Sequence, residues 1–338
     1  MSASGVGVGA PRYLAALVGN TPLLRIDYRL DGAPRRIYAK YEPMNLTGSV
    51  KDRMALYILD RASASGALRP GQPIVEASSG NTGIAFAALG RALGHRVVIF
   101  MPDWMSVERR RLIEAFGAEV IPVTRENGGF VGSVRMAAEF AARHDAFAPR
   151  QFDNDANVEA HAASTGPEIE RQLEAFGVAA DAFVAGVGTG GTVMGVGNHL
   201  RRNGRRVRVH PLEPANSPTL RTGHRVGQHR IQGISDEFVP AIVHLHELDP
   251  VVDAWDGDAI LMAQALSRRL GLGVGISSGA NVLGAIQVLE DCGEGAVVVT
   301  ILPDSNKKYL STDLCREEPV APGYWTPRVT LEGVVAVR

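Results

Sequence analysis

The sequence predicts an α/β fold built on mostly parallel sheets. Short runs rich in β-branched residues recur, each followed by a Gly- or Ser-rich turn and a stretch rich in Ala, Leu, Arg and Glu. This alternation is typical of βαβ units, which build parallel sheets. The predicted strands are residues 73–76, 97–101, 119–123, 182–187, 207–212 and 296–302.

Length and composition narrow the class of protein. With 338 residues the chain exceeds one comfortable core, so about two domains are expected. A formal net charge of −1 argues against a nucleic-acid surface. The two cysteines favour a reducing compartment, the first ten residues lack the features of a signal peptide, and no apolar run is long enough to span a membrane. We expect a cytoplasmic protein with no nucleic-acid or membrane partner.

Chemistry in an open α/β sheet is expected in the turns that follow strands. One such turn opens an Ala-rich helix and consists of Ser78, Ser79, Gly80, Asn81 and Thr82. Hydroxyl and amide groups beside a helix N-terminus suit a carboxylate ligand. The same residue types also form an ordinary helix cap and turn, so the two interpretations stand side by side.

A later turn is built from glycines and threonines, namely Gly188, Thr189, Gly190, Gly191 and Thr192. Backbone N–H groups in such a turn can surround a phosphate. The spacing Gly186-x-Gly188-x-x-Gly191 also satisfies the dinucleotide fingerprint, with Glu213 downstream. An NAD-dependent oxidoreductase is therefore an alternative.

The earliest turn, residues 42–50, precedes a helix that begins near Lys51. Lys51, Ala55, Ile58 and Ala62 form one stripe of that helix, so the lysine is aimed inward at the first turn. A helix N-terminus and partial burial both disfavour a protonated amine. A lysine in this position suits Schiff-base chemistry, although a lysine that merely extends to solvent is the ordinary alternative.

These three turns, in this order, resemble those of the cysteine synthase and cystathionine β-synthase family of fold-type II pyridoxal-phosphate (PLP) enzymes, and cysteine synthase (O-acetylserine sulfhydrylase) in particular. The motifs are Asn-x-Thr-Gly-Ser-Val-Lys-Asp-Arg at 45–53, Ser-Ser-Gly-Asn-Thr-Gly at 78–83 and Gly-Thr-Gly-Gly-Thr at 188–192. Shorter similar stretches include residues 17–24, 105–109, 165–169, 232–234 and 275–280.

The resemblance implies a fold like that of the tryptophan synthase β-subunit, with two open twisted sheets, flanking helices and the active site between the domains. It further implies a large PLP-binding domain, residues 1–44 plus 151–338, and a small mobile domain, residues 45–150. We expect the small domain to close over the site and exclude water.

The resemblance also assigns roles to residues. Lys51 would hold PLP as a Schiff base, Asn81 would bond its ring hydroxyl, and Ser305 would contact the pyridine nitrogen. The phosphate would lie on Gly188, Thr189, Gly190, Gly191 and Thr192. The substrate would be bound by Ser78, Ser79, Gly80, Asn81, Thr82, Gln151 and Gly233. No metal is implied.

The implied reaction is β-replacement through an α-aminoacrylate. Lys51 would remove the Cα proton of O-acetylserine or O-phosphoserine, and sulfide or a related thiol would then add to Cβ. L-Cysteine or an S-substituted cysteine would result. A homodimer is expected, and a serine acetyltransferase is a candidate partner.

Several positions depart from the commonest cysteine synthase pattern. Ser78 stands where threonine is more usual, Asn281 where a small residue is typical, and Ser235-Asp236-Glu237 in a loop that is often less charged. These changes are either neutral or alter specificity, because acidic residues would repel anionic nucleophiles or bind the amine of an amino-acid thiol. A minimal cystathionine β-synthase that uses serine and homocysteine is therefore an alternative.

Overall fold

The computed structural model describes residues 12–235 and 237–338, apart from the side chains of Arg12 and Asn203. The expectation for the first ten residues and the candidate Asp236 therefore lie outside the described residues. The chain forms two compact units: the smaller contains Lys51–Arg150 and the described residues up to Gly19, and the larger contains Asn20–Val50 and Gln151–Arg338. The mobile domain at residues 45–150 stays a prediction.

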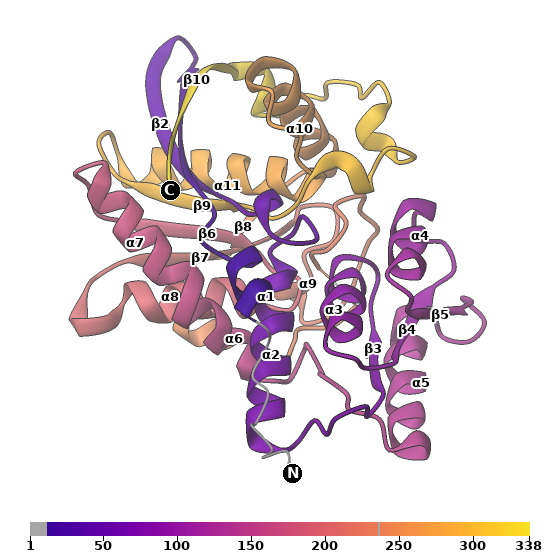
Figure 1. Cartoon of the computed structure of the whole chain (residues 1–338). Helices are drawn as coiled ribbons and strands as arrows, with labels where there is room; N and C mark the ends of the chain where they lie inside the picture. Colours follow the sequence, from indigo (N-terminus) through magenta and orange to yellow (C-terminus); the bar gives the residue numbers. More distant parts are fainter. Residues whose placement is uncertain (1–11, 236) are drawn as a thin grey trace. The chain divides into compact units, whose positions relative to one another are not determined.

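The smaller unit is organised around a three-stranded parallel sheet in the order β3-β4-β5. Helix α5 packs against β3 and β4, and α2 packs against α3 (Figure 1). Val75, Val98 and Phe140 belong to the apolar cluster under α5. The elements are α1 (Arg12–Leu17), α2 (Lys51–Ser65), β3 (Ile74–Ala77), α3 (Asn81–Ala92), β4 (Val97–Pro102), α4 (Val107–Ala115), β5 (Glu119–Val123) and α5 (Gly129–His144).

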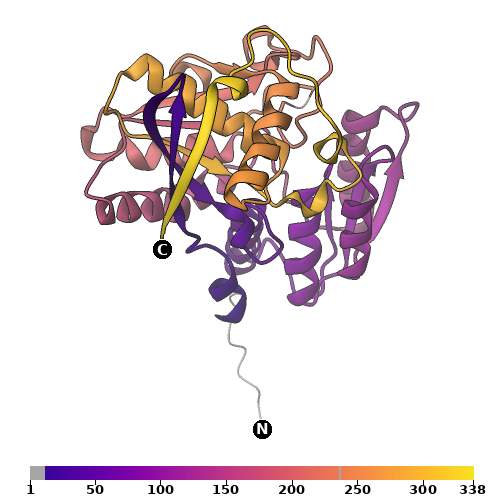
Figure 2. The same ribbon diagram turned by 90° about the horizontal axis from the view of Figure 1, so that it is seen from above.

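The larger unit contains a seven-stranded mixed sheet in the order β10-β1-β2-β9-β6-β7-β8. Pairings from β2 to β8 are parallel, whereas β10-β1-β2 is antiparallel. The yellow C-terminal strand runs beside the indigo N-terminal strands (Figure 2). The strands are β1 (Leu23–Leu30), β2 (Ala33–Tyr41), β6 (Ala182–Gly186), β7 (Arg208–Pro214), β8 (Val252–Ala254), β9 (Val298–Leu302) and β10 (Val329–Val337).

Helices cover both faces of this sheet. Alternate side chains of β6 point to opposite faces: Val184 joins the core with α10 and α11, and Phe183 joins the core with α7 and α8. The helices are α6 (Ala156–Ala160), α7 (Gly166–Ala175), α8 (Gly191–Leu200), α9 (Thr219–Thr222), α10 (Asp256–Leu270) and α11 (Ile276–Cys292). Single helical turns are η1 (Glu42–Met44), the π-helical η2 (His161–Thr165), η3 (Arg202–Gly204), η4 (Leu245–Glu247), η5 (Asn306–Lys308), η6 (Asp313–Cys315) and η7 (Thr326–Arg328).

The predicted α/β class and its strands are confirmed. The observed strand boundaries differ from the predicted ones by no more than two residues. The antiparallel strands β1, β2 and β10 and the short strand β8 were not predicted. Within the described part of the chain, no helix has both the length and the apolar character that crossing a membrane requires.

Candidate active site

The turn that precedes Lys51 is fixed by buried side chains. Glu42 is fully buried and accepts hydrogen bonds from the Thr21 hydroxyl at 2.7 Å and the Asn45 amide at 2.7 Å. The N–H of Gly48 donates to the Asn45 carbonyl at 2.9 Å, and its φ of 80° is a left-handed conformation that favours glycine. The hydrogen bonds of Glu42 therefore fix the first residues of this turn.

A buried ion pair supports the same region. Lys40 Nζ lies 2.7 Å from Glu168 Oε2 and donates to Gln172 Oε1 at 2.8 Å and to the Thr21 carbonyl. The N–H of Asn20 donates to the other Glu168 oxygen at 2.8 Å. Two of the stretches that carry the resemblance, residues 17–24 and 165–169, thus meet in one polar network.

Lys51 is the first residue of α2. Ala55, Ile58 and Ala62 are buried and Lys51 is only partly exposed, so the predicted stripe is confirmed as a buried face. Helix α2 packs against α3, which begins at Asn81. Lys51 and Asn81 thus occupy the N-terminal ends of neighbouring helices, where backbone N–H groups favour a neutral amine and bound anions.

The turn after β3 has the helix-capping contacts that the ordinary interpretation of its sequence expects, and its binding of a carboxylate stays a prediction. Ser78 Oγ accepts the N–H groups of Gly80 at 3.0 Å and Gly83 at 2.8 Å, so this hydroxyl stabilises the start of α3. Thr82 is buried in the first turn of the helix. Ser79 and Asn81 stand on either side of Gly80 at the helix start, where a carboxylate is favourable.

Arg109 supports this turn and was not singled out from the sequence, although it lies in the similar stretch 105–109. Its side chain is buried, and Nη1 lies 3.4 Å from the Ser79 carbonyl. A Cβ at Gly80 would lie 2.7 Å from Arg109 Cδ, so any larger residue at position 80 would displace the arginine.

The glycine turn between β6 and α8 is tightly enclosed by backbone and side chains. A Cβ at Gly188 would lie 2.3 Å from the Gly233 carbonyl oxygen, and one at Gly191 would lie 2.0 Å from Asn157 Oδ1. Gly190 has a φ of 89°, and its Cβ would lie 2.1 Å from Val243 Cγ2. Only glycine fits these three positions.

Two side chains distant in the sequence hold the threonines of this turn. Asn157 Nδ2 donates to Thr189 Oγ1 at 2.9 Å and to the carbonyl of Gln151 at 2.9 Å. The ring of His161, on the π-helical turn, lies between Thr165 Oγ1 at 2.8 Å and Thr192 Oγ1 at 3.3 Å. Neither Asn157 nor His161 was identified from the sequence, because no local pattern marks them.

These features fit the phosphate of PLP. The first N–H groups of α8 have no preceding helical turn to bond with, and glycines allow an anion to approach them closely. Thr189 and Thr192 add hydroxyls held by Asn157 and His161. Gly188, Thr189, Gly190, Gly191 and Thr192 are therefore the residues that would hold the phosphate.

Ser305 follows β9 in the same unit. It forms a bridge with Val274, and a Cβ at Gly48 would lie 3.8 Å from Ser305 Oγ. Lys308 is buried and its Nζ donates to the Gly48 carbonyl at 3.3 Å. The turn before Lys51 and the predicted pyridine-contacting serine therefore lie together.

Two of the positions that depart from the family pattern, Asn281 and Ser235, lie near the end of β6. Asn281 Oδ1 accepts the Gly186 N–H at 2.8 Å, and its Nδ2 donates to the Ile301 carbonyl at 2.8 Å. A Cβ at Gly186 would lie 2.9 Å from Ile234 Cγ2. Asn281 thus connects the ends of β6 and β9 beside the loop that contains Ser235.

Glu213 does not support dinucleotide binding. Its carboxylate accepts the N–H of Leu220 at 2.6 Å and lies 3.3 Å from Arg221 Nη1, so it stabilises the start of α9. Burial raises the pKa of the Glu213 carboxyl.

The predicted site residues fall into two groups. The smaller unit contains Lys51, Ser78, Ser79, Gly80, Asn81 and Thr82, and the larger contains Gln151, Gly188, Thr189, Gly190, Gly191, Thr192, Gly233 and Ser305. Across residues 12–235 and 237–338, no cluster of three or more His, Cys, Asp or Glu side chains could hold a metal ion.

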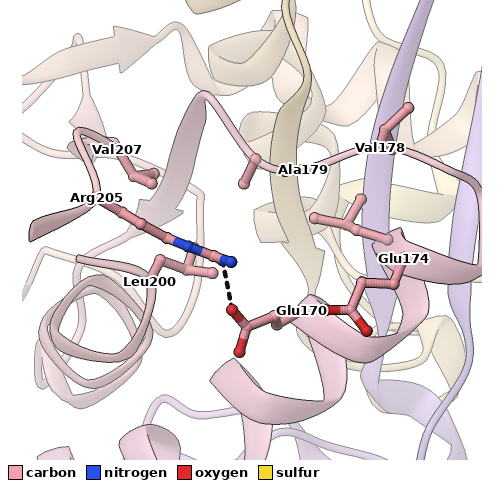
Figure 3. A pocket seen from close by; sticks show the side chains of 9 residues that line it. Glu170, Glu174, Val178, Ala179, Leu200, Arg205 and Val207 are labelled. Atoms are coloured by element: carbon pink, nitrogen blue, oxygen red, sulfur yellow. Dashed lines mark hydrogen bonds and ion pairs between the residues drawn. The ribbon is translucent and has the colours of Figure 1, made fainter. Parts of the chain in front are cut away.

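A separate small pocket on the larger unit contains none of the predicted residues. It is lined by α7 and the end of α8, with Glu170 and Arg205 paired across it (Figure 3). A hydrogen bond from His199 at 2.9 Å, assisted by Arg205, lowers the pKa of the Glu170 carboxyl. This carboxylate is already neutralised by cations of the same unit.

Comparison with known proteins places the chain in a family. Residues 14–304 match the model of the pyridoxal-phosphate dependent enzymes. The cysteine synthase of Staphylococcus aureus is 39% identical over 301 residues, which cover 89% of this chain and 96% of that protein.

Solved structures agree with this match. A hydrogen sulfide-producing enzyme from Fusobacterium nucleatum superposes with a TM-score of 0.93 at 52% identity, covering 96% of this chain and 98% of that chain. An O-acetylserine dependent cystathionine β-synthase from Helicobacter pylori has a TM-score of 0.81 at 31% identity, covering 88% and 97%. This assignment replaces the oxidoreductase alternative. The chain belongs to the pyridoxal-phosphate dependent enzymes and is a cysteine synthase-like member of that family.

Proposed function

We propose that this chain catalyses β-replacement on O-acetylserine or O-phosphoserine with sulfide or a related thiol, giving L-cysteine or an S-substituted cysteine. The observation that carries the proposal is the glycine turn before α8. Neighbouring atoms leave no room for a side chain at three of its glycines, and Asn157 and His161 contact the hydroxyls of Thr189 and Thr192. Bound PLP supplies an electron sink that makes the Cα proton acidic and allows the β substituent to leave.

The proposed chemistry of the chain centres on Lys51. Its amine holds the cofactor and, once free, takes and returns the proton at the substrate Cα. Asn81 and Ser305 orient the ring; a hydroxyl at Ser305, unlike a carboxylate, does little to keep the pyridine nitrogen protonated. The substrate is bound by Ser78, Ser79, Gly80, Asn81, Thr82, Gln151 and Gly233.

A second candidate is release of hydrogen sulfide from cysteine, in which sulfur leaves Cβ and another nucleophile replaces it. It is favoured by the hydrogen sulfide-producing neighbour, whose 52% identity exceeds the 39% of the cysteine synthase. In sequence, Asp236 and Glu237 add negative charge after Ser235, which disfavours approach of anionic sulfide. Glu237 is partly neutralised by Arg225 at 3.3 Å.

Visible absorption tests the role of Lys51. We expect wild-type protein to bind PLP with a Schiff-base band that Lys51→Ala abolishes and that O-acetylserine shifts. Lys307→Ala, at an exposed lysine, is the matched control and keeps the band. A band that survives in Lys51→Ala would contradict the assignment.

A matrix of substrates then identifies the reaction. O-Acetylserine, O-phosphoserine, serine and cysteine are each combined with sulfide, thiosulfate or homocysteine, and amino-acid products and released sulfide are measured. The highest kcat/KM for an O-activated serine with sulfide supports cysteine synthesis. Sulfide release from cysteine supports the second candidate, and serine with homocysteine identifies a cystathionine β-synthase. Absence of turnover with every pair overturns the proposal.

We also propose that residues 45–150 close over the bound substrate, that the enzyme acts as a homodimer, and that a serine acetyltransferase is a partner. Both cysteines, Cys292 and Cys315, are free thiols, which suits a cytoplasmic enzyme.

A further inference from the structure

We infer that Arg230 is a positioning residue that holds residues 229–235 as a fixed wall beside the glycine turn and thereby selects the nucleophile by size. This inference rests on the proposed β-replacement and deepens it. It concerns the second reactant, and its starting point is that the loop contacts the glycine turn at Val187 and Gly188.

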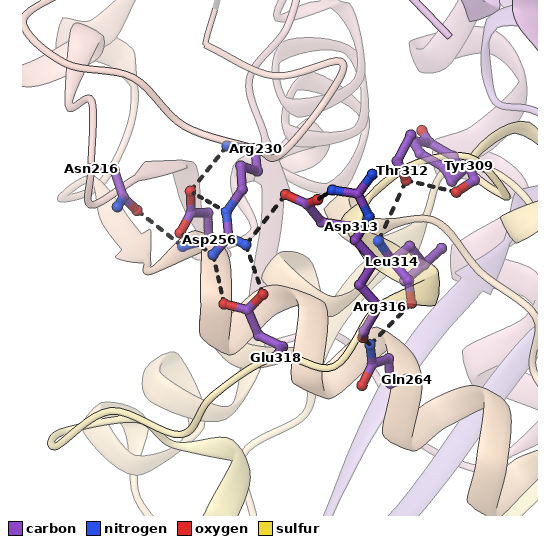
Figure 4. Close-up of polar contacts among 10 residues, drawn as sticks. All are labelled: Asn216, Arg230, Asp256, Gln264, Tyr309, Thr312, Asp313, Leu314, Arg316 and Glu318. Atoms are coloured by element: carbon purple, nitrogen blue, oxygen red, sulfur yellow. Dashed lines mark hydrogen bonds and ion pairs between the residues drawn. The ribbon is translucent and has the colours of Figure 1, made fainter. Parts of the chain in front are cut away.

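Three carboxylates hold the Arg230 guanidinium at one end of this loop (Figure 4). Nη1 and Nη2 donate to the two oxygens of Glu318 at 2.7 and 2.6 Å. Nε donates to Asp256 at 3.2 Å, and the Arg230 backbone N–H reaches the same carboxylate at 3.0 Å. Asp313 adds a longer contact at 3.4 Å. The Glu318 side chain is only 7% exposed, and such bidentate pairs fix geometry as well as adding energy.

Ser235 holds the other end in a left-handed conformation, with a φ of 52°. Its N–H donates to the Val187 carbonyl at 2.7 Å, and its hydroxyl donates to Thr219 Oγ1 at 2.9 Å. Its carbonyl lies 3.1 Å from His229 Nε2. A non-glycine residue in this region is strained and persists where its surroundings impose the conformation.

Between these anchors the loop faces the glycine turn and open space. The Gly233 carbonyl oxygen blocks any side chain at Gly188, whereas a Cβ on Gly233 itself would have no described residue within 4 Å other than its two chain neighbours. Gln232 Oε1 and His229 Nδ1 are shielded from solvent and have no hydrogen-bond partner among the described residues. Such groups take a water or a ligand as partner.

The apolar side chains of the loop fix residues 229–235 against the core of the larger unit. Ile231 and Ile234 are buried in the core shared with α10 and α11. With both ends bonded and both isoleucines packed, the loop is held in one position, which fixes this boundary of the open space beside Gly233. Loss of the Arg230 clamp frees one end and enlarges that space for bulkier thiols.

The test uses the full-length PLP-bound enzyme and compares kcat/KM for homocysteine and sulfide with one donor. We expect Arg230→Met to raise the homocysteine-to-sulfide ratio about tenfold, the scale on which pocket shape discriminates. Glu318→Gln should give a smaller rise, since one neutral amide weakens the bidentate pair. Hydrogen exchange of the 229–235 peptide should quicken in both variants. The donor-induced spectral change should keep its rate.

Arg328→Met is the matched control, because it removes an exposed arginine that pairs with Asp31 at 2.6 Å in the same unit. Its ratio should equal that of the wild type. If Arg230→Met does not fold, Glu318→Gln carries the test. An unchanged ratio together with faster exchange at 229–235 overturns the inference, as does unchanged exchange. A wild-type enzyme without any donor-induced spectral change overturns the proposed function instead, before a variant is compared.

Discussion

Lys40 is a fully buried cation whose charge is balanced inside the protein. Glu168 lies 2.7 Å from its amine, and the side chains of Glu168 and Lys40 are 11% and 0% exposed, respectively. Breaking a buried ion pair by removing one partner leaves a charge without compensation, which costs about 3–5 kcal/mol. We expect Lys40→Met to lower the free energy of unfolding by this amount, measured by urea denaturation.

The control for this substitution is Arg25→Met. Arg25 pairs with Asp27 at 3.0 Å, with both side chains 30% exposed. Surface pairs of this kind contribute about 0–1 kcal/mol. Equal losses in the two variants would show that the Lys40 network is not an energetically special part of the interior.

At the scale of elements, the turn before α8 keeps its shape because its glycines have no side chains that would overlap their neighbours. A methyl group at Gly191 would overlap the Asn157 amide, which in turn holds Thr189 and the Gln151 carbonyl. We therefore expect Gly191→Ala to weaken PLP binding by about tenfold or more, equivalent to about 1.4 kcal/mol. Fluorescence titration of the apoprotein with PLP measures this loss.

Gly177→Ala separates this effect from general strain. Gly177 follows α7 with a φ of 73°, and apart from its chain neighbours none of the residues that the structure describes lies within 4 Å of the position that a methyl group would occupy there. This control should lose some stability, because alanine disfavours a positive φ, yet bind PLP like the wild type. Similar PLP affinities in the two variants would contradict the assignment of the glycine turn as the phosphate site.

At the scale of the whole molecule, the sheet of the larger unit is completed by its last strand. β10 pairs with β1 along its whole length, from Leu23 opposite Val337 to Leu30 opposite Val329. A chain that ends at Arg328 would expose the edge of β1 and part of α10, which packs against β10. We expect the thermal midpoint to fall by about 10 °C, since each kcal/mol lowers it by roughly 2–4 °C.

Val335→Thr provides the comparison for this deletion, because Val335 is exposed on β10 and its loss should change stability by less than about 0.5 kcal/mol. A midpoint of the shortened chain equal to that of Val335→Thr would mean that β10 adds little to the sheet.

Sequence patterns predicted the helices and strands whose formation depends mainly on neighbouring residues. The stripe from Lys51 to Ala62 and the apolar strand from Val97 follow from periodicity, and the structure contains both. The alternation in β1, with Leu24 and Ile26 buried, was a usable strand signal that was missed. Its pairing with β10 was not accessible, because no local preference specifies a partner so distant in the chain.

The site shows the same division. The turns at Ser78 and Gly188 were found from residue types, and their roles stay predictions. Arg109, Asn157 and His161 support the site through contacts with residues about 30 positions away. Patterns among neighbouring residues in the sequence do not predict such contacts.

The antiparallel edge β10-β1-β2 has a consequence for biosynthesis. A ribosome adds about 5–20 residues per second, so β1 emerges on the order of tens of seconds before its partner β10 exists. The smaller unit is built almost entirely from the continuous segment Lys51–Arg150 and can fold meanwhile. The hairpin of β1 and β2 must wait with its apolar side chains uncovered. We expect this hairpin to be prone to aggregation during translation until its partner strands are made.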